Sequence, residues 1–165
     1  MRVDKLTKAQ AASIADYLRP PYRMIWEIGI TTGLRISDIL QLTYRQIRRR
    51  DIKIRERKTG KIRRIYIRKH IAQDINLYCT RHKIIDDDRV FSVSRQQVWR
   101  ALKRAAARAG IDVNIGSHTM RKTYSALYIQ SGHSIRDLQQ RLNHDNITDT
   151  INYLLSNNEI GGSKA

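Results

Sequence analysis

The stretch from Ser117 to Tyr153 decides how the rest of the chain is interpreted. It begins SHTMR at 117–121, continues through an apolar segment to LNH at 142–144, and ends with NY at 152–153. These motifs offer a guanidinium, two imidazoles and a phenol, without a cluster of carboxylates. Arginine binds phosphate oxygens in pairs, histidine exchanges a proton near neutral pH, and tyrosine can act as a nucleophile. The residue types therefore suit phosphate chemistry that needs no metal ion.

Helical spacing organises this stretch and the segments before it. Within the stretch, the spacing predicts helices over 117–131, from 134 onward and after 146. His118 and Arg121 are three residues apart and therefore share one face of the first of these helices. His144 lies in a turn, and Tyr153 lies on the last helix. Further helices are predicted over 7–18, from 24 to 32, over 69–81 and from 94 to 110, with capping boxes formed by Thr7 and Gln10 and by Ser94 and Gln97.

Two polar residues follow the helix that Gly33 is expected to end. Arg35 emerges at a turn beside this glycine, where its guanidinium could be held rigidly. Asp38 is three residues further on, toward the same side. We expect Asp38 to orient Arg35 rather than to react.

Between 46 and 67 the pattern changes from helical spacing to alternation. Isoleucines at 52 and 54 and at 65 and 67 flank a turn at Thr59-Gly60, which predicts a β-hairpin carrying Lys58 near its turn. A short strand over 47–49 would extend it to a three-stranded antiparallel sheet. The expected fold class is therefore α+β, mainly α-helical, with a small three-stranded sheet. The basic positions of the hairpin are either a solvated face or a surface that lies along DNA.

Composition limits the class of protein. The 165 residues, 41% of them hydrophobic, suffice for one domain over 1–155, followed by a polar tail over 156–165 that is flexible or docks on a neighbouring protomer. The formal charge of +17 attracts polyanions, so nucleic acid is the first partner to consider, ahead of an acidic membrane surface or ribosomal RNA. Basic charge alone does not decide among these partners.

Other features exclude several classes. The single Cys79 allows neither an intramolecular disulfide nor a cysteine-based zinc site. We find no signal peptide and no apolar run of about twenty residues, which predicts an intracellular, cytoplasmic protein. The acidic run at 86–88 is interpreted as a solvated turn rather than a metal site, because adjacent carboxylates in a loop seldom converge on one ion.

Taken singly, these residues are more typical of ordinary packing and capping than of catalysis. Taken in order, they resemble the tyrosine recombinase, or phage integrase, family over about residues 5–155. The matching positions are Arg35 with Asp38, Lys58, His118, Arg121, His144 and Tyr153. The resemblance implies the catalytic domain of a site-specific DNA recombinase or integrase that uses no metal ion, no ATP and no other cofactor.

The resemblance also implies a role for each matching position. Tyr153 would attack the scissile phosphate and form a 3′-phosphotyrosyl intermediate, which Arg35 and Arg121 would stabilise. Lys58 would protonate the leaving 5′-oxygen. His118 would assist proton transfer at Tyr153 or hold the phosphate, and His144 would donate a hydrogen bond to a phosphate oxygen, with Asp38 in a supporting role. Possible DNA backbone contacts are Lys61, Arg100, Lys103, Arg104 and Lys122.

The implied partner is double-stranded DNA, bound by a homotetramer on paired sites, with a monomer possible without DNA and no membrane involved. The implied location is the nucleoid of a bacterial cell, with the gene carried by a bacterium or a phage. The helix over 94–110 has a basic face that is either a solvated surface or a phosphate contact. Asn143 and Lys122 occupy positions where the family commonly has glycine and histidine, and neither removes a catalytic group.

Most members of the family also carry an amino-terminal helical domain that closes around DNA, whereas this sequence begins almost directly with the catalytic domain. The chain is then either an excised fragment or a compact stand-alone recombinase of the fimbrial phase-variation type. A non-catalytic DNA-binding regulator with the same fold is the alternative function. A general RNA-binding protein is a weaker third interpretation, because it leaves the ordered residues unexplained.

Overall fold

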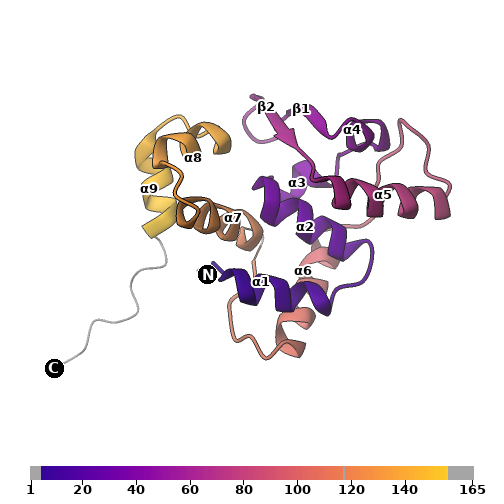
Figure 1. The fold of residues 1–165 in the computed structure, drawn as a ribbon, viewed down its shortest axis with the longest axis horizontal. Coiled ribbons are helices and arrows are strands. Elements are labelled where there is room, and N and C mark those ends of the chain that lie inside the picture. The colour runs from indigo at the N-terminus through magenta and orange to yellow at the C-terminus, as the bar shows by residue number, and fades with distance from the viewer. Residues whose placement is uncertain (1–4, 117, 156–165) are drawn as a thin grey trace.

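The structure is a computed structural model that describes residues 5–116 and 118–155 (Figure 1). The expected tail over 156–165 and Ser117 lie outside the described residues. The elements are, in chain order, α1 (Lys8–Asp16), α2 (Tyr22–Thr32), α3 (Ile36–Ile39), α4 (Tyr44–Arg49), β1 (Asp51–Arg55), β2 (Ile62–Tyr66), α5 (Lys69–Arg81), α6 (Arg95–Arg108), α7 (Thr119–Gln130), α8 (Ile135–Leu142) and α9 (Ile147–Leu155).

Local signals begin and end several of these helices as the sequence predicts. Thr7 and Gln10 form a reciprocal capping box at the start of α1, and Ser94 and Gln97 form another at the start of α6. Gly33 ends α2 in the left-handed conformation, with φ of 65°. The predicted helices over 7–18, 24–32, 69–81, 94–110 and after 117, 134 and 146 are thereby confirmed, with small shifts at their ends.

Helix α2 is the centre of the fold. Ile25, Trp26 and Ile28 have no exposed surface, and the helix contacts α1, α3, α5, α6 and α7. Gly29 allows α7 to approach closely, since a Cβ at this position would collide with Sδ of Met120. Figure 1 shows α2 in the middle of the molecule, with α5 at one end and α8 and α9 at the other. We call α1–α6 with the hairpin the body, and α7–α9 the C-terminal layer.

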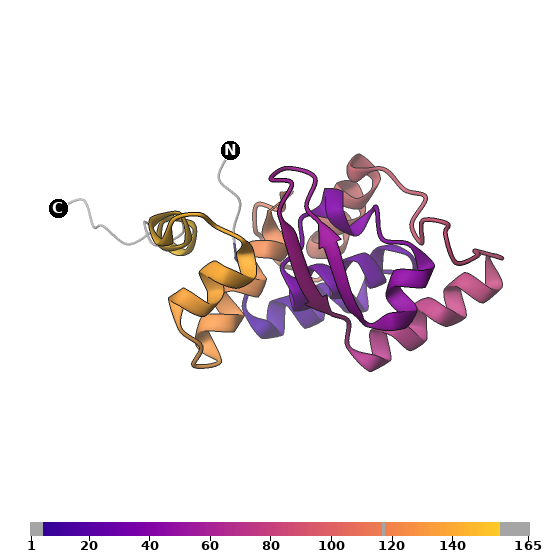
Figure 2. The same ribbon diagram turned by 90° about the horizontal axis from the view of Figure 1, so that it is seen from above.

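The predicted third strand is wrong. Residues 47–49 belong to α4, because Thr43 and Gln46 form a capping box and Ile47 turns its fully buried side chain into the core. Within the described residues the sheet has two strands, β1 and β2, paired antiparallel from Asp51 opposite Tyr66 to Arg55 opposite Ile62 (Figure 2). The predicted hairpin is therefore confirmed, and the isoleucines of its inner face belong to the main hydrophobic core.

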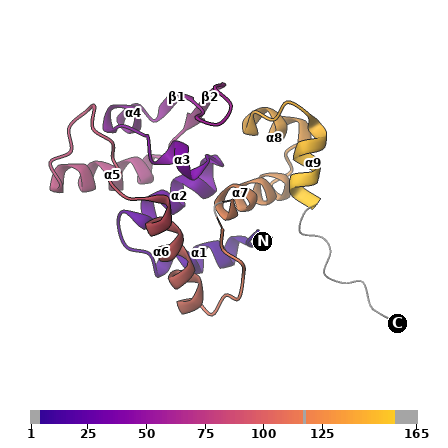
Figure 3. The same cartoon turned by 180° about the vertical axis from the view of Figure 1, so that it is seen from behind.

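In the C-terminal layer, α7 packs on α2. The other two helices, α8 and α9, lie apart from α5 and α6 when seen from behind (Figure 3). Tyr124, Leu138 and Leu142 form its own small apolar cluster. Asn143 ends α8 with φ of 53°, a left-handed conformation that asparagine tolerates and that glycine adopts without strain. None of the helices in residues 5–116 and 118–155 is long and apolar enough to cross a membrane.

Candidate active site

The carbonyl of Gly33 is the point at which two distant arginines meet. It accepts a hydrogen bond from Nη1 of Arg121 at 2.9 Å and another from Nη1 of Arg63 at 3.3 Å. The Tyr124 ring packs so closely on Gly33 that a Cβ there would collide with Cδ1 of the ring. The left-handed turn after α2 thus directs a backbone acceptor at two guanidinium groups.

Arg121 is held by the backbone of both regions of the molecule. Its side chain is buried, and Nη2 donates to the carbonyl of Leu142 at 2.6 Å, while Nη1 donates to Gly33 in the body. Nη2 also lies 3.4 Å from Nε2 of His144. Burial lowers the pKa of Arg121 to about 10, so the group remains charged at neutral pH. The guanidinium is therefore fixed beside one of the predicted histidines.

Arg35 is paired with a carboxylate that the sequence analysis did not single out. Its Nη1 lies 2.6 Å from Oε2 of Glu56, whose side chain is fully buried. The expectation that Asp38 orients Arg35 is not met, because Oδ1 of Asp38 accepts instead from the backbone N–H of Arg57 at 3.0 Å. Asp38 therefore holds the hairpin loop, and Glu56 holds Arg35.

A signal for Glu56 was present in the sequence. Inward positions of the first strand alternate through Ile52 and Ile54, and the next position in this register is Glu56. On the second strand Arg63 precedes Ile65 in the same inward register. A charged residue on the buried face of a hairpin marks a site at which charge must be paired.

Tyr153 on α9 lies between the two predicted histidines. Its ring centroid is 5.9 Å from that of His144 and 6.3 Å from that of His118, both edge to face. Nδ1 of His144 lies 2.9 Å from Oγ1 of Thr150, the buried residue of α9. Nζ of Lys122 lies 5.8 Å from the centroid of the Tyr153 ring. The structure thus brings both imidazoles, the phenol and Arg121 together.

The environment shifts the pKa values of these groups in opposite directions. Burial raises the pKa of the Tyr153 phenol, and Arg121 and Arg35 partly oppose this shift. Burial, followed by the charges of the same two arginines, lowers the pKa of His144 to about 4. Partial loss of water and the nearby cations also lower the pKa of His118 below its ordinary value. Both imidazoles are therefore neutral at pH 7, and the phenol is protonated.

Lys58 lies exposed in the loop between β1 and β2, and its charge is among those that act on His118. The loop is tied down around it, because Oγ1 of Thr59 donates to Oε2 of Glu56 at 3.0 Å and the N–H of Gly60 donates to the Glu56 carbonyl at 2.8 Å. Nζ of Lys61, a predicted DNA contact, pairs instead with the carboxylate of Asp145. The loop therefore reaches both the site and the C-terminal layer.

The other predicted DNA contacts, apart from Lys122, lie on one helix. Arg100, Lys103 and Arg104 are exposed on α6, and Nζ of Lys103 lies 5.3 Å from the centroid of the Trp99 ring. This basic face is therefore open to solvent and available to phosphate groups.

The acidic run at 86–88 has contacts of another kind. Asp86 pairs with Arg48 and Asp87 with Arg45, both on α4. The adjacent carboxylates thus have different partners and do not converge on one point.

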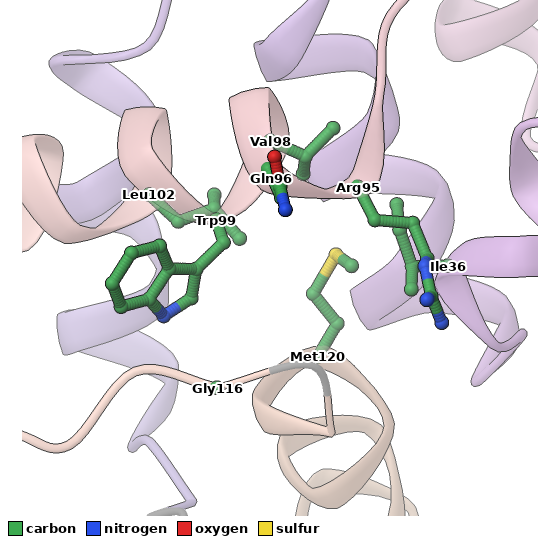
Figure 4. A pocket seen from close by; sticks show the side chains of 8 residues that line it. All are labelled: Ile36, Arg95, Gln96, Val98, Trp99, Leu102, Gly116 and Met120. Carbon is green, nitrogen blue, oxygen red and sulfur yellow. The ribbon is translucent and has the colours of Figure 1, made fainter.

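An apolar recess lies between α6 and the start of α7 (Figure 4). Its lining is Ile36, Arg95, Gln96, Val98, Trp99, Leu102, Gly116 and Met120, and Nε1 of Trp99 donates to the Ile115 carbonyl at 2.9 Å. None of the six predicted catalytic side chains lines it. The recess is therefore separate from the point at which the arginines, histidines and tyrosine converge.

Comparison with known proteins places this chain in a family. The phage integrase family profile matches residues 4–159. The chain is 36% identical to the probable integrase/recombinase YoeC of Bacillus subtilis, over 76% of this chain and 72% of that protein. It is 30% identical to the tyrosine recombinase XerD of Shewanella oneidensis, over 77% of this chain and 46% of that protein.

Solved structures have the same fold. The crystal structure of XerA recombinase matches 92% of this chain and 58% of its own with a TM-score of 0.77 at 20% identity. The Tn1549 transposon integrase, solved in complex with transposon right end DNA, matches 97% of this chain and 62% of its own with a TM-score of 0.68 at 20% identity. At these identities the likeness shows the fold alone.

The chain belongs to the phage integrase family. The predicted family and the mainly helical fold with a small antiparallel sheet are confirmed, apart from the third strand. The chain spans about half the length of the XerD relatives that it matches.

Proposed function

We propose that the protein is a tyrosine site-specific recombinase that cleaves and rejoins double-stranded DNA through a 3′-phosphotyrosyl intermediate. The observation that carries this proposal is the convergence on Arg121, whose guanidinium is fixed by Gly33 and Leu142 and lies 3.4 Å from His144, against which Tyr153 packs. Segments that are distant in the sequence thereby present a clamp, an imidazole and a nucleophile to one point.

In the proposed cleavage step, Oη of Tyr153 attacks the scissile phosphorus in line. The new bond joins phosphorus to the phenol oxygen, and the bond from phosphorus to the 5′-oxygen breaks. The phenol is protonated at neutral pH, and burial raises its pKa further. Its proton must therefore be removed as the bond forms. His118 can accept that proton because its own lowered pKa keeps the ring neutral at pH 7.

The leaving 5′-oxygen takes a proton from Lys58, whose exposed position in the hairpin loop allows it to reach DNA bound over the site. Arg35 and Arg121 contact the non-bridging oxygens and stabilise the charge that develops in the transition state. His144 donates to a phosphate oxygen, which requires that its Nε2 carries the proton when DNA displaces the contact with Arg121.

Rejoining reverses these bonds without ATP. A free 5′-hydroxyl attacks the phosphotyrosyl bond, whose energy has been conserved, and releases Tyr153. Attack by a strand of a second duplex yields recombination, and this requires a tetramer on paired sites. Basic side chains on α6 with Lys122 contact the DNA backbone. The formal charge of +17 supports DNA as this partner, and the nucleoid is the corresponding location.

A trapping experiment tests the function and does not require the DNA target sequence to be known. The protein is incubated with a pool of nicked duplexes of random sequence, in which cleavage releases a short fragment and prevents rejoining. Covalent adducts are isolated under denaturing conditions and their DNA is sequenced. We expect the wild type to form an adduct with an enriched sequence and Tyr153→Phe to form none.

Tyr66→Phe is the matched control, because this exposed tyrosine lies on β2 outside the site and its variant should form the adduct normally. DNA that the wild type binds specifically but never joins covalently would contradict the enzyme and support the non-catalytic regulator.

A further inference from the structure

Two buried charges in the hairpin lie outside the six groups of the proposed mechanism. Glu56 is fully buried, and Arg63 is only 5% exposed. Burying a charged group away from water is unfavourable unless a group of opposite charge compensates it. Such residues are therefore explained only by what they contact.

The contacts form one continuous chain of charge. Oε2 of Glu56 lies 2.6 Å from Nη1 of Arg35, and Oε1 lies 3.7 Å from Nη1 of Arg63. Arg63 in turn donates to the carbonyls of Thr32 and Gly33 at the end of α2. The order is therefore Arg35, Glu56, Arg63, with the last anchored to the same Gly33 carbonyl that holds Arg121.

The second oxygen of Glu56 is not satisfied in the ordinary way. Within the described part of the chain, Oε1 is buried and accepts no hydrogen bond, and Nη1 of Arg63 lies 3.7 Å from it. A carboxylate whose only role was structural would be expected to use both oxygens. In Glu56, Oε2 instead accepts hydrogen bonds from both Arg35 and Thr59.

We propose that Glu56 is a positioning residue that sets the guanidinium of Arg35 for the scissile phosphate, and that Arg63 neutralises Glu56 so that Arg35 keeps its attraction for the phosphate. This inference rests on the proposed function.

The electrostatic part of the inference follows from the order of the charges. A lone carboxylate beside Arg35 would cancel much of the field that the arginine directs at a phosphate. With Arg63 on the far side of Glu56, the three groups together carry a formal charge of one positive unit. Arg35 is thus held by a strong charge-assisted hydrogen bond while the group as a whole remains attractive to an anion.

Glu56 also connects Arg35 to the loop that carries Lys58. Thr59, the residue after Lys58, donates to the same Oε2 that holds Arg35. The backbone of Arg57, the residue before Lys58, is held by Asp38. Glu56 therefore links the position of Arg35 to that of the loop with Lys58, and Asp38 holds the same loop at a second point.

The test is the single-turnover rate of adduct formation on a duplex recovered by the trapping experiment, measured together with affinity for that duplex. Glu56→Gln keeps the size of the side chain and removes its charge. We expect the rate to fall about 10- to 100-fold, as for a small misplacement of a reacting group, with DNA affinity changed less than about threefold. Asp51→Asn is the control, because Asp51 pairs with Arg64 on the exposed side of the same hairpin.

A double-mutant cycle separates positioning from a general effect on folding. If Glu56 acts through Arg35, Glu56→Gln should slow adduct formation less than about twofold in an Arg35→Lys background. An equal slowing in both backgrounds would overturn the inference. So would a wild-type rate for Glu56→Gln in a protein that otherwise forms the adduct.

Thr59→Val keeps the inference testable if Glu56→Gln does not fold. It removes only the hydroxyl that donates to Oε2, on an exposed loop residue, and should slow the adduct about three- to tenfold. An unchanged rate for this variant would count against the proposal. Failure of the wild type itself to form an adduct is a different result, because it rejects the proposed function.

Discussion

The two regions of the molecule hold their parts of the site by different means. In the body, Arg35 and Arg63 are held by a buried carboxylate and by backbone carbonyls at the end of α2, a helix that packs in the core. In the C-terminal layer, Thr150 is the only residue of α9 that is buried, and Leu155 remains 52% exposed. The two arginines proposed to bind phosphate are thus held by groups in the core, whereas the proposed nucleophile is carried by a helix with little buried surface.

This difference indicates how the site divides its work. Groups that stabilise a transition state act best when they need no rearrangement, and buried pairs in a packed core meet that condition. A helix that buries little apolar surface separates from the rest at a smaller cost in free energy. The fold therefore favours a fixed phosphate clamp and a more easily repositioned tyrosine.

The largest effect is expected at Arg121, which joins the two regions. Arg121→Met removes the charge and the hydrogen bond to the Leu142 carbonyl, and it leaves the Gly33 carbonyl with the longer contact from Arg63. We expect adduct formation to fall by at least about 10³-fold and the free energy of unfolding to fall by about 2–3 kcal/mol, measured by trapping and by urea denaturation. Arg81→Met, at the exposed end of α5, should change neither. Near-normal adduct formation by a folded Arg121→Met protein would refute the proposed role of Arg121 in binding the phosphate.

Gly33 tests the contact between the body and α7. Gly33→Ala forces a side chain into a residue with φ of 65° and drives its Cβ into the Tyr124 ring. Gly132→Ala is matched to it, because Gly132 also has a positive φ but has no atom within 4 Å of a Cβ. We expect unfolding free energy to fall by about 2–4 kcal/mol for the first and about 1 kcal/mol for the second. Equal losses in urea denaturation would show that the ring contact contributes nothing.

Prediction from sequence succeeded where the signal was local. Capping boxes at Thr7 and Ser94, the left-handed glycine after α2 and the alternation of the hairpin all depend on residues within a few positions of one another. The ordered polar residues also identified the family. The strand expected over 47–49 failed because a capping box at Thr43 is a stronger local signal than the single apolar residue Ile47.

The features of the site that the sequence analysis missed are contacts between residues far apart in the sequence. Nothing near Asp38 in the sequence reveals that the backbone of Arg57 lies opposite its carboxylate, or that Glu56 takes the place beside Arg35. The carbonyls that hold Arg121 come from residues 88 and 21 positions away. The burial of Glu56 could have been predicted from the alternation of inward positions, but its contact with Arg35 could be found only from the folded chain.

The smallest expected effect concerns the pH dependence of the C-terminal layer. Burial and two arginines lower the pKa of His144 from 6.5 to about 4, and its Nδ1 contacts Thr150 on α9. Below pH 6.5 the unfolded chain takes up a proton that the folded chain does not, so stability present above pH 6.5 is lost as the pH falls toward 4.

We therefore expect the free energy of unfolding to fall by about 1 kcal/mol through His144 between about pH 7.5 and about pH 5, after allowance for solvent screening of a half-buried group. Urea denaturation of wild type and His144→Gln at both pH values measures this difference, and the variant should lose less stability than the wild type. His133→Gln, at an exposed position after α7, should retain the wild-type pH dependence. If His144→Gln and the wild type lose equal stability, the imidazole is not held neutral against α9.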